Sequence, residues 1–141
     1  MMKRDATAVW RGSGKEGKGE MTTQSGVLKN TQYAFSTRFE NGVGTNPEEL
    51  IGAAHAGCYA MALSFALNKE GFTPKELKAT AQVTLDKEGE GFAITTVALK
   101  LDAQIPEISN DKFQAIAEDA KKNCPVSKVL NAKITLEAKL H

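Results

Sequence analysis

Cysteine, histidine and aromatic residues are all scarce in this chain. Its 141 residues include two cysteines, two histidines and one tryptophan, and aromatic residues make up only 6%. Two cysteines cannot form the disulfide framework that holds small secreted proteins together. Two distant cysteines and two histidines also do not match any recognised set of metal ligands. We therefore expect no disulfide scaffold, no metal and no cofactor.

A strong net charge is missing as well. Lysine and arginine number 18 and acidic residues 17, which gives a formal net charge of +1. A nearly neutral chain without basic runs does not predict nucleic acid or a membrane as partner. The first ten residues include basic side chains, but no apolar stretch follows them as in a secretory signal. We expect a cytoplasmic protein that forms one domain over residues 1–141.

The hydrophobic pattern predicts strands, a long helix, a hairpin, further helices and a final strand. The first forty residues are expected to form strands, and in 33–39 every second residue would face the same side. Similar patterns predict the later elements, namely strands over 79–86, 97–105 and 132–140, a helix capped by Ser109 and a short helix over 124–130. This order is typical of an α+β fold rather than of repeated βαβ units.

One helix of roughly 24 residues, about 36 Å long, is predicted between Asn46 and Gly71. Asn46 can cap its start, Pro47 suits the first helical position, and Gly71 suits the end. Residues 50–67 carry no charge, so the helix is long enough to span a membrane. The stretch is rich in alanine and glycine, however, and also contains His55. We therefore expect a buried central helix instead.

Local chemistry favours Cys124 over Cys58 as the reactive thiol. Cys124 precedes Pro125, and a thiolate at the start of a helix would face free N–H groups. Cys58 lies within the apolar helix, where burial raises the pKa of a thiol unless a charge offsets it. His55 lies on the same face three residues earlier. A Cys58–His55 hydrolase is thus one hypothesis, although a lone buried histidine is more often a hydrogen-bonded core residue.

Two segments of the chain are specific enough to indicate a family. They are YAFSTRFENGVGTNPEELIGAAHAGCYAMALS over residues 33–64 and NCPVSKVLNAKITLEAKL over 123–140. With them the chain closely resembles the OsmC/Ohr peroxidases, and within these the osmotically inducible OsmC branch, over nearly its whole length. The resemblance implies an α+β fold in which two chains intertwine as a homodimer. Antiparallel sheets would surround long central helices, with two active sites at the interface.

The resemblance also implies an activity and the residues that perform it. The protein would reduce organic hydroperoxides, and less well hydrogen peroxide, with Cys58 as the attacking thiol. The resulting sulfenic acid would condense with Cys124 to a disulfide, which an external dithiol, of lipoyl type in this family, would reduce. Arg38 would be the basic residue near the reactive thiol. Glu48 would orient Arg38, with Glu49 as the alternative for that role.

The spacing along the long helix favours a dimer. Glu48 and Cys58 are ten residues apart, about 15 Å along the helix axis, so they cannot share a site within one chain. Two copies crossing antiparallel near residue 53 would bring Glu48 of one copy beside Cys58 of the other. The residues around the crossing are small, which allows two helices to approach closely: Gly52, Ala53, Ala54 and Ala56.

Three other hypotheses stay open besides the peroxidase. The first is a thiol redox sensor that reacts once without turnover. The second is the Cys58–His55 hydrolase. The third is a protein that binds a small apolar ligand and whose thiols have no function. Catalytic consumption of tert-butyl hydroperoxide with a dithiol separates the peroxidase from all three. The role of His55 is not settled by the sequence.

Overall fold

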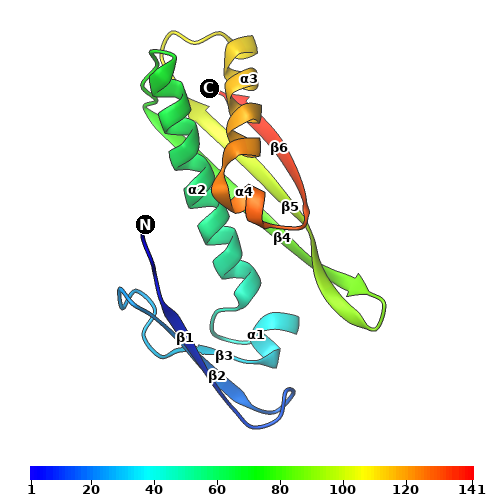
Figure 1. Cartoon of the computed structure of the whole chain (residues 1–141). Helices are drawn as coiled ribbons and strands as arrows, with labels where there is room; N and C mark the ends of the chain where they lie inside the picture. The colour runs from blue at the N-terminus through cyan, green and yellow to red at the C-terminus, as the bar shows by residue number, and fades with distance from the viewer. The chain divides into compact units, whose positions relative to one another are not determined.

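The computed structural model describes residues 1–141, and the chain divides into two compact units, Met1–Leu50 and Ile51–His141. Figure 1 shows the elements along the chain. They are β1 (Ala6–Arg11), β2 (Lys18–Thr23), β3 (Thr31–Tyr33), α1 (Phe35–Phe39), α2 (Pro47–Lys69), β4 (Glu76–Glu88), β5 (Gly91–Gln104), α3 (Asn110–Asn123), α4 (Pro125–Val129) and β6 (Lys133–Leu140). The predicted α+β class is confirmed.

The first unit is a small antiparallel sheet with strand order β1-β2-β3. The glycine-rich segment after β1 forms the turn into β2, where the Gly17 N–H donates to the carbonyl of Ser13 over 2.8 Å. Every residue of β1 is exposed. The buried residues of this unit are Thr37, Thr45 and Glu48, and no hydrophobic side chain within residues 1–50 is buried. The first unit therefore lacks an apolar core of its own.

The expected strand over 33–39 is wrong, because the structure places the short helix α1 there. The Thr37 hydroxyl donates to the carbonyl of Ala34 and accepts from the Ala34 N–H, both over 2.9 Å, which closes a tight turn. Phe35 and Phe39 stack with ring centroids 4.8 Å apart. The two phenylalanines are four positions apart, a spacing that fits one face of a helix as well as one face of a strand.

Helix α2 begins and ends where the sequence predicts. The Asn46 side chain accepts a hydrogen bond from the Glu49 N–H over 2.8 Å, and Pro47 is the first helical residue. Past the helix, Gly71 has a φ of +89°, a conformation that glycine adopts without strain. Helix α2 is long and apolar enough to cross a membrane, but core helices of water-soluble proteins also meet these two criteria.

The expected burial of α2 is only partly met within one chain. Tyr59, Leu63 and Leu67 follow each other at intervals of four and are fully buried. The side chains of Met61 and Phe65 are instead 65% exposed, and 28% of the apolar stretch is buried in total. The helix thus has one covered face and one apolar face that this chain does not cover.

The second unit holds a three-stranded sheet with order β4-β5-β6. Strands β4 and β5 form the expected hairpin, with an irregularity between Thr84 and Leu85. Strand β6 pairs parallel to β5, whereas the resemblance led us to expect antiparallel sheets. The reason is the connection through α3 and α4, which brings the chain back to Thr96 within β5, the partner of Lys133, so that β6 runs in the same direction as β5. Figure 1 shows this crossover.

The hydrophobic core lies in the second unit, between β5 and the helices α2 and α3. Helix α3 is capped by Ser109 as predicted, whose hydroxyl accepts from the Lys112 N–H over 3.2 Å. Side chains from these elements form one buried cluster, which comprises Tyr59, Leu63, Leu67, Val97, Leu99, Leu101, Ala103, Ile105, Phe113, Ala117, Ala120 and Cys124. A cysteine therefore forms part of the core, at the junction of α3 and α4.

Candidate active site

Arg38 and Glu48 form an ion pair in the first unit. Nε of Arg38 donates a hydrogen bond to Oε1 of Glu48 over 2.7 Å. The guanidinium also lies over the ring of Phe39, 5.5 Å from its centroid. Helix α1 supplies the arginine and the first turn of α2 supplies the carboxylate. This contact uses one of the five N–H donors of the guanidinium, which leaves its outer edge available for other acceptors.

The two neighbouring glutamates have different partners. The Glu49 carboxylate accepts a hydrogen bond from the Thr45 hydroxyl over 2.7 Å, next to the cap of α2. Glu48 alone contacts Arg38, and its second oxygen, Oε2, is buried without a hydrogen-bond partner. Of the two glutamates, Glu48 is thus the one that contacts Arg38, whereas Glu49 contacts Thr45.

Cys58 and Cys124 lie together in the second unit, although 65 residues of chain separate them. Cys58 is half-buried in the middle of α2, and Cys124 is fully buried between α3 and α4. Each thiol is close enough to shift the pKa of the other, and neither cysteine is in a disulfide. Two neighbouring reduced thiols are the arrangement from which a disulfide can form.

The pKa values of the two thiols are shifted in opposite directions. Burial raises the pKa of Cys58; hydrogen bonding from the Val126 backbone opposes this, and the Cys124 thiol adds to it. Burial also acts to raise the pKa of Cys124. It is outweighed by hydrogen bonds from the Ser127 backbone, the Cys58 thiol and the Ser127 hydroxyl, so this pKa lies below its ordinary value. Within one chain the local physics thus favours Cys124 as the thiolate, as the sequence indicates.

His55 has a different partner from the one that the hydrolase hypothesis needs. It is fully buried, and its Nε2 lies 2.7 Å from the hydroxyl of Ser127 in α4. Its other nitrogen, Nδ1, is buried without a hydrogen-bond partner. Burial lowers the pKa of His55, so the neutral ring is favoured. No hydrogen bond joins His55 to Cys58, and the Cys58–His55 dyad is absent from the structure.

Ser127 is the residue of this site that the sequence analysis missed. Its hydroxyl lies 2.7 Å from Nε2 of His55, and it acts to lower the pKa of Cys124. The signal for it is the CPVS segment, in which the serine follows the cysteine by three residues. Cys124 is the cap residue of α4, and a side chain three positions after the cap residue can face back toward it. Tyr59 follows Cys58 in the helix, and its buried hydroxyl donates a hydrogen bond to the Ala117 carbonyl over 3.1 Å.

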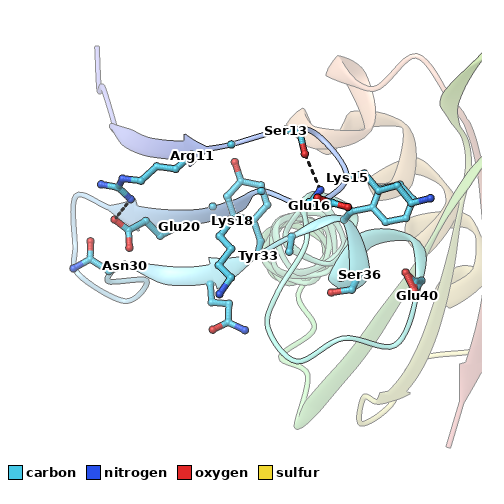
Figure 2. Close-up of a pocket in the computed structure, with 16 residues that line it drawn as sticks. Arg11, Ser13, Lys15, Glu16, Lys18, Glu20, Asn30, Tyr33, Ser36 and Glu40 are labelled. Atoms are coloured by element: carbon cyan, nitrogen blue, oxygen red, sulfur yellow. Dashed lines mark hydrogen bonds and ion pairs between the residues drawn. The ribbon is translucent and has the colours of Figure 1, made fainter.

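A polar cavity of about 1100 Å³ lies in the first unit (Figure 2). Its wall includes three basic and three acidic side chains, namely Arg11, Lys15, Lys18, Glu16, Glu20 and Glu40. Figure 2 shows the contact of Arg11 with Glu20 and the cap that Ser13 provides to the Glu16 N–H. Neither cysteine lines this cavity, and neither does Arg38. It is therefore not the site of the thiols.

Comparison with known proteins covers most of the chain. The family model described as OsmC-like protein matches residues 39–139, a range that includes Glu48 and both cysteines and begins directly after Arg38. Peroxiredoxin OsmC of Escherichia coli strain K12 is 54% identical over 133 residues, covering 94% of this chain and 93% of that protein. Organic hydroperoxide resistance protein OhrB of Bacillus subtilis is 25% identical over 123 residues, covering 86% and 88%.

Solved structures show the same architecture. The crystal structure of OhrB of Bacillus subtilis has a TM-score of 0.71 at 26% identity, covering 96% of this chain and 98% of that one. An organic hydroperoxide resistance protein from Elizabethkingia anophelis has a TM-score of 0.76 at 25% identity, covering 100% and 98%. The likeness therefore extends over both units of the chain.

Proposed function

Because the chain belongs to the OsmC family, we propose that it is a cysteine-based peroxidase that reduces hydroperoxides. The observation that carries the proposal is the contact between the two free thiols of Cys58 and Cys124. It occurs in a chain that is 54% identical to a peroxiredoxin over nearly its full length. A thiol that is oxidised by peroxide needs a second thiol nearby to form a disulfide, and this pair meets that need.

The chemistry proceeds in three steps in this proposal. The Cys58 thiolate attacks the terminal peroxide oxygen, the O–O bond breaks, and an alcohol leaves after taking up a proton. Cys58 is then a sulfenic acid. Cys124 attacks its sulfur, which forms the Cys58–Cys124 disulfide and releases water. An external dithiol reduces this disulfide by thiol–disulfide exchange and becomes a disulfide itself; we propose a dithiol of lipoyl type.

Cys58 needs a nearby cation to play the attacking role. Burial raises its pKa, and a protonated thiol is a poor nucleophile. Arginine remains charged even where it is partly desolvated, and its fork also suits contacts with peroxide oxygens. We propose that Arg38 supplies this charge and that Glu48 fixes its orientation through the 2.7 Å hydrogen bond.

The arginine would come from a second copy of the chain. Glu48, which holds Arg38, lies ten residues before Cys58 on the same helix, and ten residues correspond to about 15 Å of helix. A two-fold axis near residue 53 would bring these positions together between chains. In this proposal residues 1–141 form one domain, and two such domains intertwine as a homodimer with two sites.

Burial within one chain supports this dimer. The first unit has no buried hydrophobic side chain, so by itself it cannot offset the conformational entropy lost on folding. One side of α2 also remains exposed at intervals of four residues, at Ala53, Gly57, Met61 and Phe65. Both features are expected of a chain that completes its core with a partner.

The proposed substrates are organic hydroperoxides in preference to hydrogen peroxide. The residues next to Cys58 on α2 are glycine, alanine and tyrosine, with no charged side chain between Leu50 and Leu67. An alkyl group gains free energy on leaving water for such surroundings, whereas hydrogen peroxide has no alkyl group to bury. We place the protein in the cytoplasm, where both cysteines would be kept reduced between turnovers.

A turnover assay tests the proposal. The purified protein is mixed with tert-butyl hydroperoxide and a dithiol such as dihydrolipoamide, and the remaining peroxide is measured over time. We expect many equivalents of peroxide to be consumed per subunit. Consumption that stops after one equivalent would contradict the enzyme and indicate a redox sensor. No consumption at all would indicate a ligand-binding protein whose thiols are incidental.

A further inference from the structure

We propose that Asn46 is a positioning residue for the Arg38–Glu48 ion pair, because its side-chain amide holds the end of α1 against the first turn of α2. The inference rests on the proposed function only for the use that the reaction makes of this pair. Capping of α2 accounts for the oxygen of the amide but not for its nitrogen. All the residues involved lie in the first compact unit.

The amide of Asn46 makes hydrogen bonds to two different helices. Its oxygen, Oδ1, accepts from the Glu49 N–H over 2.8 Å, which satisfies a free donor at the start of α2. Its nitrogen, Nδ2, donates to the Thr37 carbonyl over 2.9 Å, which satisfies a free acceptor at the end of α1. One planar group therefore caps both helices and fixes the spacing between these two ends.

The orientation of this amide follows from the groups that it faces. A backbone N–H can only donate a hydrogen bond, and a carbonyl can only accept one. If the amide were turned over, Nδ2 would face the Glu49 N–H and Oδ1 would face the Thr37 carbonyl, so both hydrogen bonds would be lost. The bond to Thr37 therefore needs an N–H donor on the side chain of residue 46.

The two ends that the amide joins carry the two members of the ion pair. Thr37 directly precedes Arg38, and Asn46 lies two residues before Glu48. The amide thus ties the backbone beside the arginine to the backbone beside the glutamate, in addition to the 2.7 Å hydrogen bond from Nε to Oε1. A movement of α1 away from the first turn of α2 would have to break both links.

The surroundings of the ion pair make such a tie important. Glu48 Oε2 is buried without a hydrogen-bond partner, so the bond at Oε1 is the one that orients the carboxylate. No hydrophobic side chain within residues 1–50 is buried, and the buried residues there are Thr37, Thr45 and Glu48. Without an apolar core, the placement of α1 beside the first turn of α2 depends on hydrogen bonds such as that of Asn46.

Substitutions of Asn46 separate its two hydrogen bonds. Asn46→Asp and Asn46→Ser keep an oxygen that caps α2, since aspartate and serine cap helices about as well as asparagine does. Aspartate has no N–H donor for the Thr37 carbonyl, and the serine hydroxyl ends one atom short of the amide nitrogen. Asn46→Ala removes both bonds. The first two variants should therefore unfold thermally close to the parent's midpoint, and Asn46→Ala should unfold at a lower temperature.

The Arg38 Nε–H reports on the ion pair without any peroxide, because hydrogen-bonded N–H groups exchange with water more slowly than free ones. Its exchange rate is measured by NMR on ¹⁵N-labelled protein, and the signal is assigned by its absence in Arg38→Lys. We expect exchange to be roughly tenfold faster in both Asn46→Ser and Asn46→Asp. These rates should approach the rate in Glu48→Ala, where the acceptor itself is gone.

Gln32 provides the matched control. Its Nε2 donates to the Val43 carbonyl over 2.9 Å, so it makes the same type of bond at the same length, within the same unit. Val43 lies in the loop between α1 and α2, and neither residue adjoins Arg38 or Glu48 in the sequence. Gln32→Ala should therefore leave the exchange rate of the Arg38 Nε–H within about twofold of the parent's.

The outcomes distinguish positioning from capping and from a general loosening of the loop. Parent-like exchange in Asn46→Ser and Asn46→Asp would overturn the proposal and leave Asn46 as a helix cap only. Equal acceleration in Gln32→Ala would also overturn it, because any lost bond in this loop would then suffice. In a steady-state assay with tert-butyl hydroperoxide and a dithiol, Asn46→Ser should lose activity as Glu48→Ala does, while Gln32→Ala keeps it.

The exchange measurement also separates this proposal from the proposed function. Faster exchange in the Asn46 variants of a protein whose parent does not turn over peroxide would support the positioning role and refute the peroxidase. Turnover by the parent, with exchange and activity unchanged in Asn46→Ser and Asn46→Asp, would support the peroxidase and refute the positioning role.

Discussion

Arg38 and Glu48 are joined by a hydrogen bond of 2.7 Å from Nε to Oε1. The two side chains differ in exposure, because 40% of the arginine side chain is exposed but only 10% of the glutamate side chain. A largely buried carboxylate therefore fixes one edge of the guanidinium and leaves the other edge open. In the proposed mechanism, an oriented cation of this kind offsets the effect of burial, which raises the pKa of the Cys58 thiol.

Replacing Arg38 is expected to shift the ionisation of Cys58 to higher pH. A nearby positive charge favours the thiolate, so Arg38→Ala should raise the Cys58 pKa and lower peroxide consumption at pH 7 by at least roughly tenfold. Arg38→Lys should also be much less active, because an ammonium group cannot reproduce the planar fork. The pH dependence of Cys58 alkylation by iodoacetamide, in a Cys124→Ser background, measures the shift.

Arg11 provides the matched control for this experiment. It is an exposed arginine of the same unit, and it contacts Glu20 at the longer distance of 3.5 Å. Arg11→Ala should leave both the alkylation profile and the activity close to those of the parent. A Cys58 profile that is the same in Arg38→Ala as in the parent would remove Arg38 from the stabilisation of the thiolate.

The adjacent glutamates should respond very differently to the same substitution. Glu48→Ala removes the carboxylate that holds Arg38, so we expect a loss of activity approaching that of Arg38→Ala. Glu49→Ala removes only a contact with Thr45 near the cap of α2 and should change activity less than about twofold. Steady-state rates with tert-butyl hydroperoxide make the comparison. Equal losses in the two variants would show that general damage to the helix start, and not the Arg38 contact, is responsible.

The exposed stripe of α2 is expected to hold two chains together. Phe65→Asp or Met61→Asp would bury a carboxylate in the proposed interface, which should weaken dimerisation by at least roughly 100-fold. Val27, an 85% exposed residue of the turn after β2, serves as the control in Val27→Asp. Size-exclusion chromatography with light scattering gives the molecular mass. A parent that elutes as a monomer, or a Phe65→Asp protein that stays dimeric, would contradict this arrangement.

The sequence predicts those elements whose ends carry specific signals. Asn46, Pro47 and Gly71 mark the limits of α2, and Ser109 marks the start of α3, because caps and stops act locally. The segment 33–39 was mispredicted as a strand because its aromatic residues also fit a helix, and the turn depends on two hydrogen bonds of one threonine. Local patterns could not resolve that choice.

Contacts between distant parts of the chain are harder to predict. The contact of Cys58 with Cys124 was expected only from the family resemblance, since no spacing rule links residues so far apart. The link from His55 to Ser127 spans α2 and α4 and was not expected at all. The parallel pairing of β6 with β5 depends on the path of α3 and α4, whereas the alternation of β6 is the same for either direction.

Mixed dimers are expected to show that each site uses both chains. A Cys58→Ser subunit and a Glu48→Ala subunit, each inactive alone, are unfolded and refolded together. If Glu48 acts across the interface, every mixed dimer has one site with both defects and one intact site, so activity should return. Statistical pairing makes about half of the dimers mixed. Absence of recovery, with mixed dimers confirmed by native mass spectrometry, would place Glu48 and Cys58 of one chain in the same site.

Mapping the first oxidation tests the central claim most directly. Cys124→Ser protein is treated with one equivalent of tert-butyl hydroperoxide in the presence of dimedone, and the adduct is located by peptide mass spectrometry. Cys58→Ser protein is treated in the same way. We predict a dimedone adduct on Cys58 in the first protein, and neither an adduct nor peroxide consumption in the second. An adduct on Cys124 in the Cys58→Ser protein, with full peroxide consumption and no oxidation of Cys58 in the other variant, would contradict the account and reverse the roles of the two thiols.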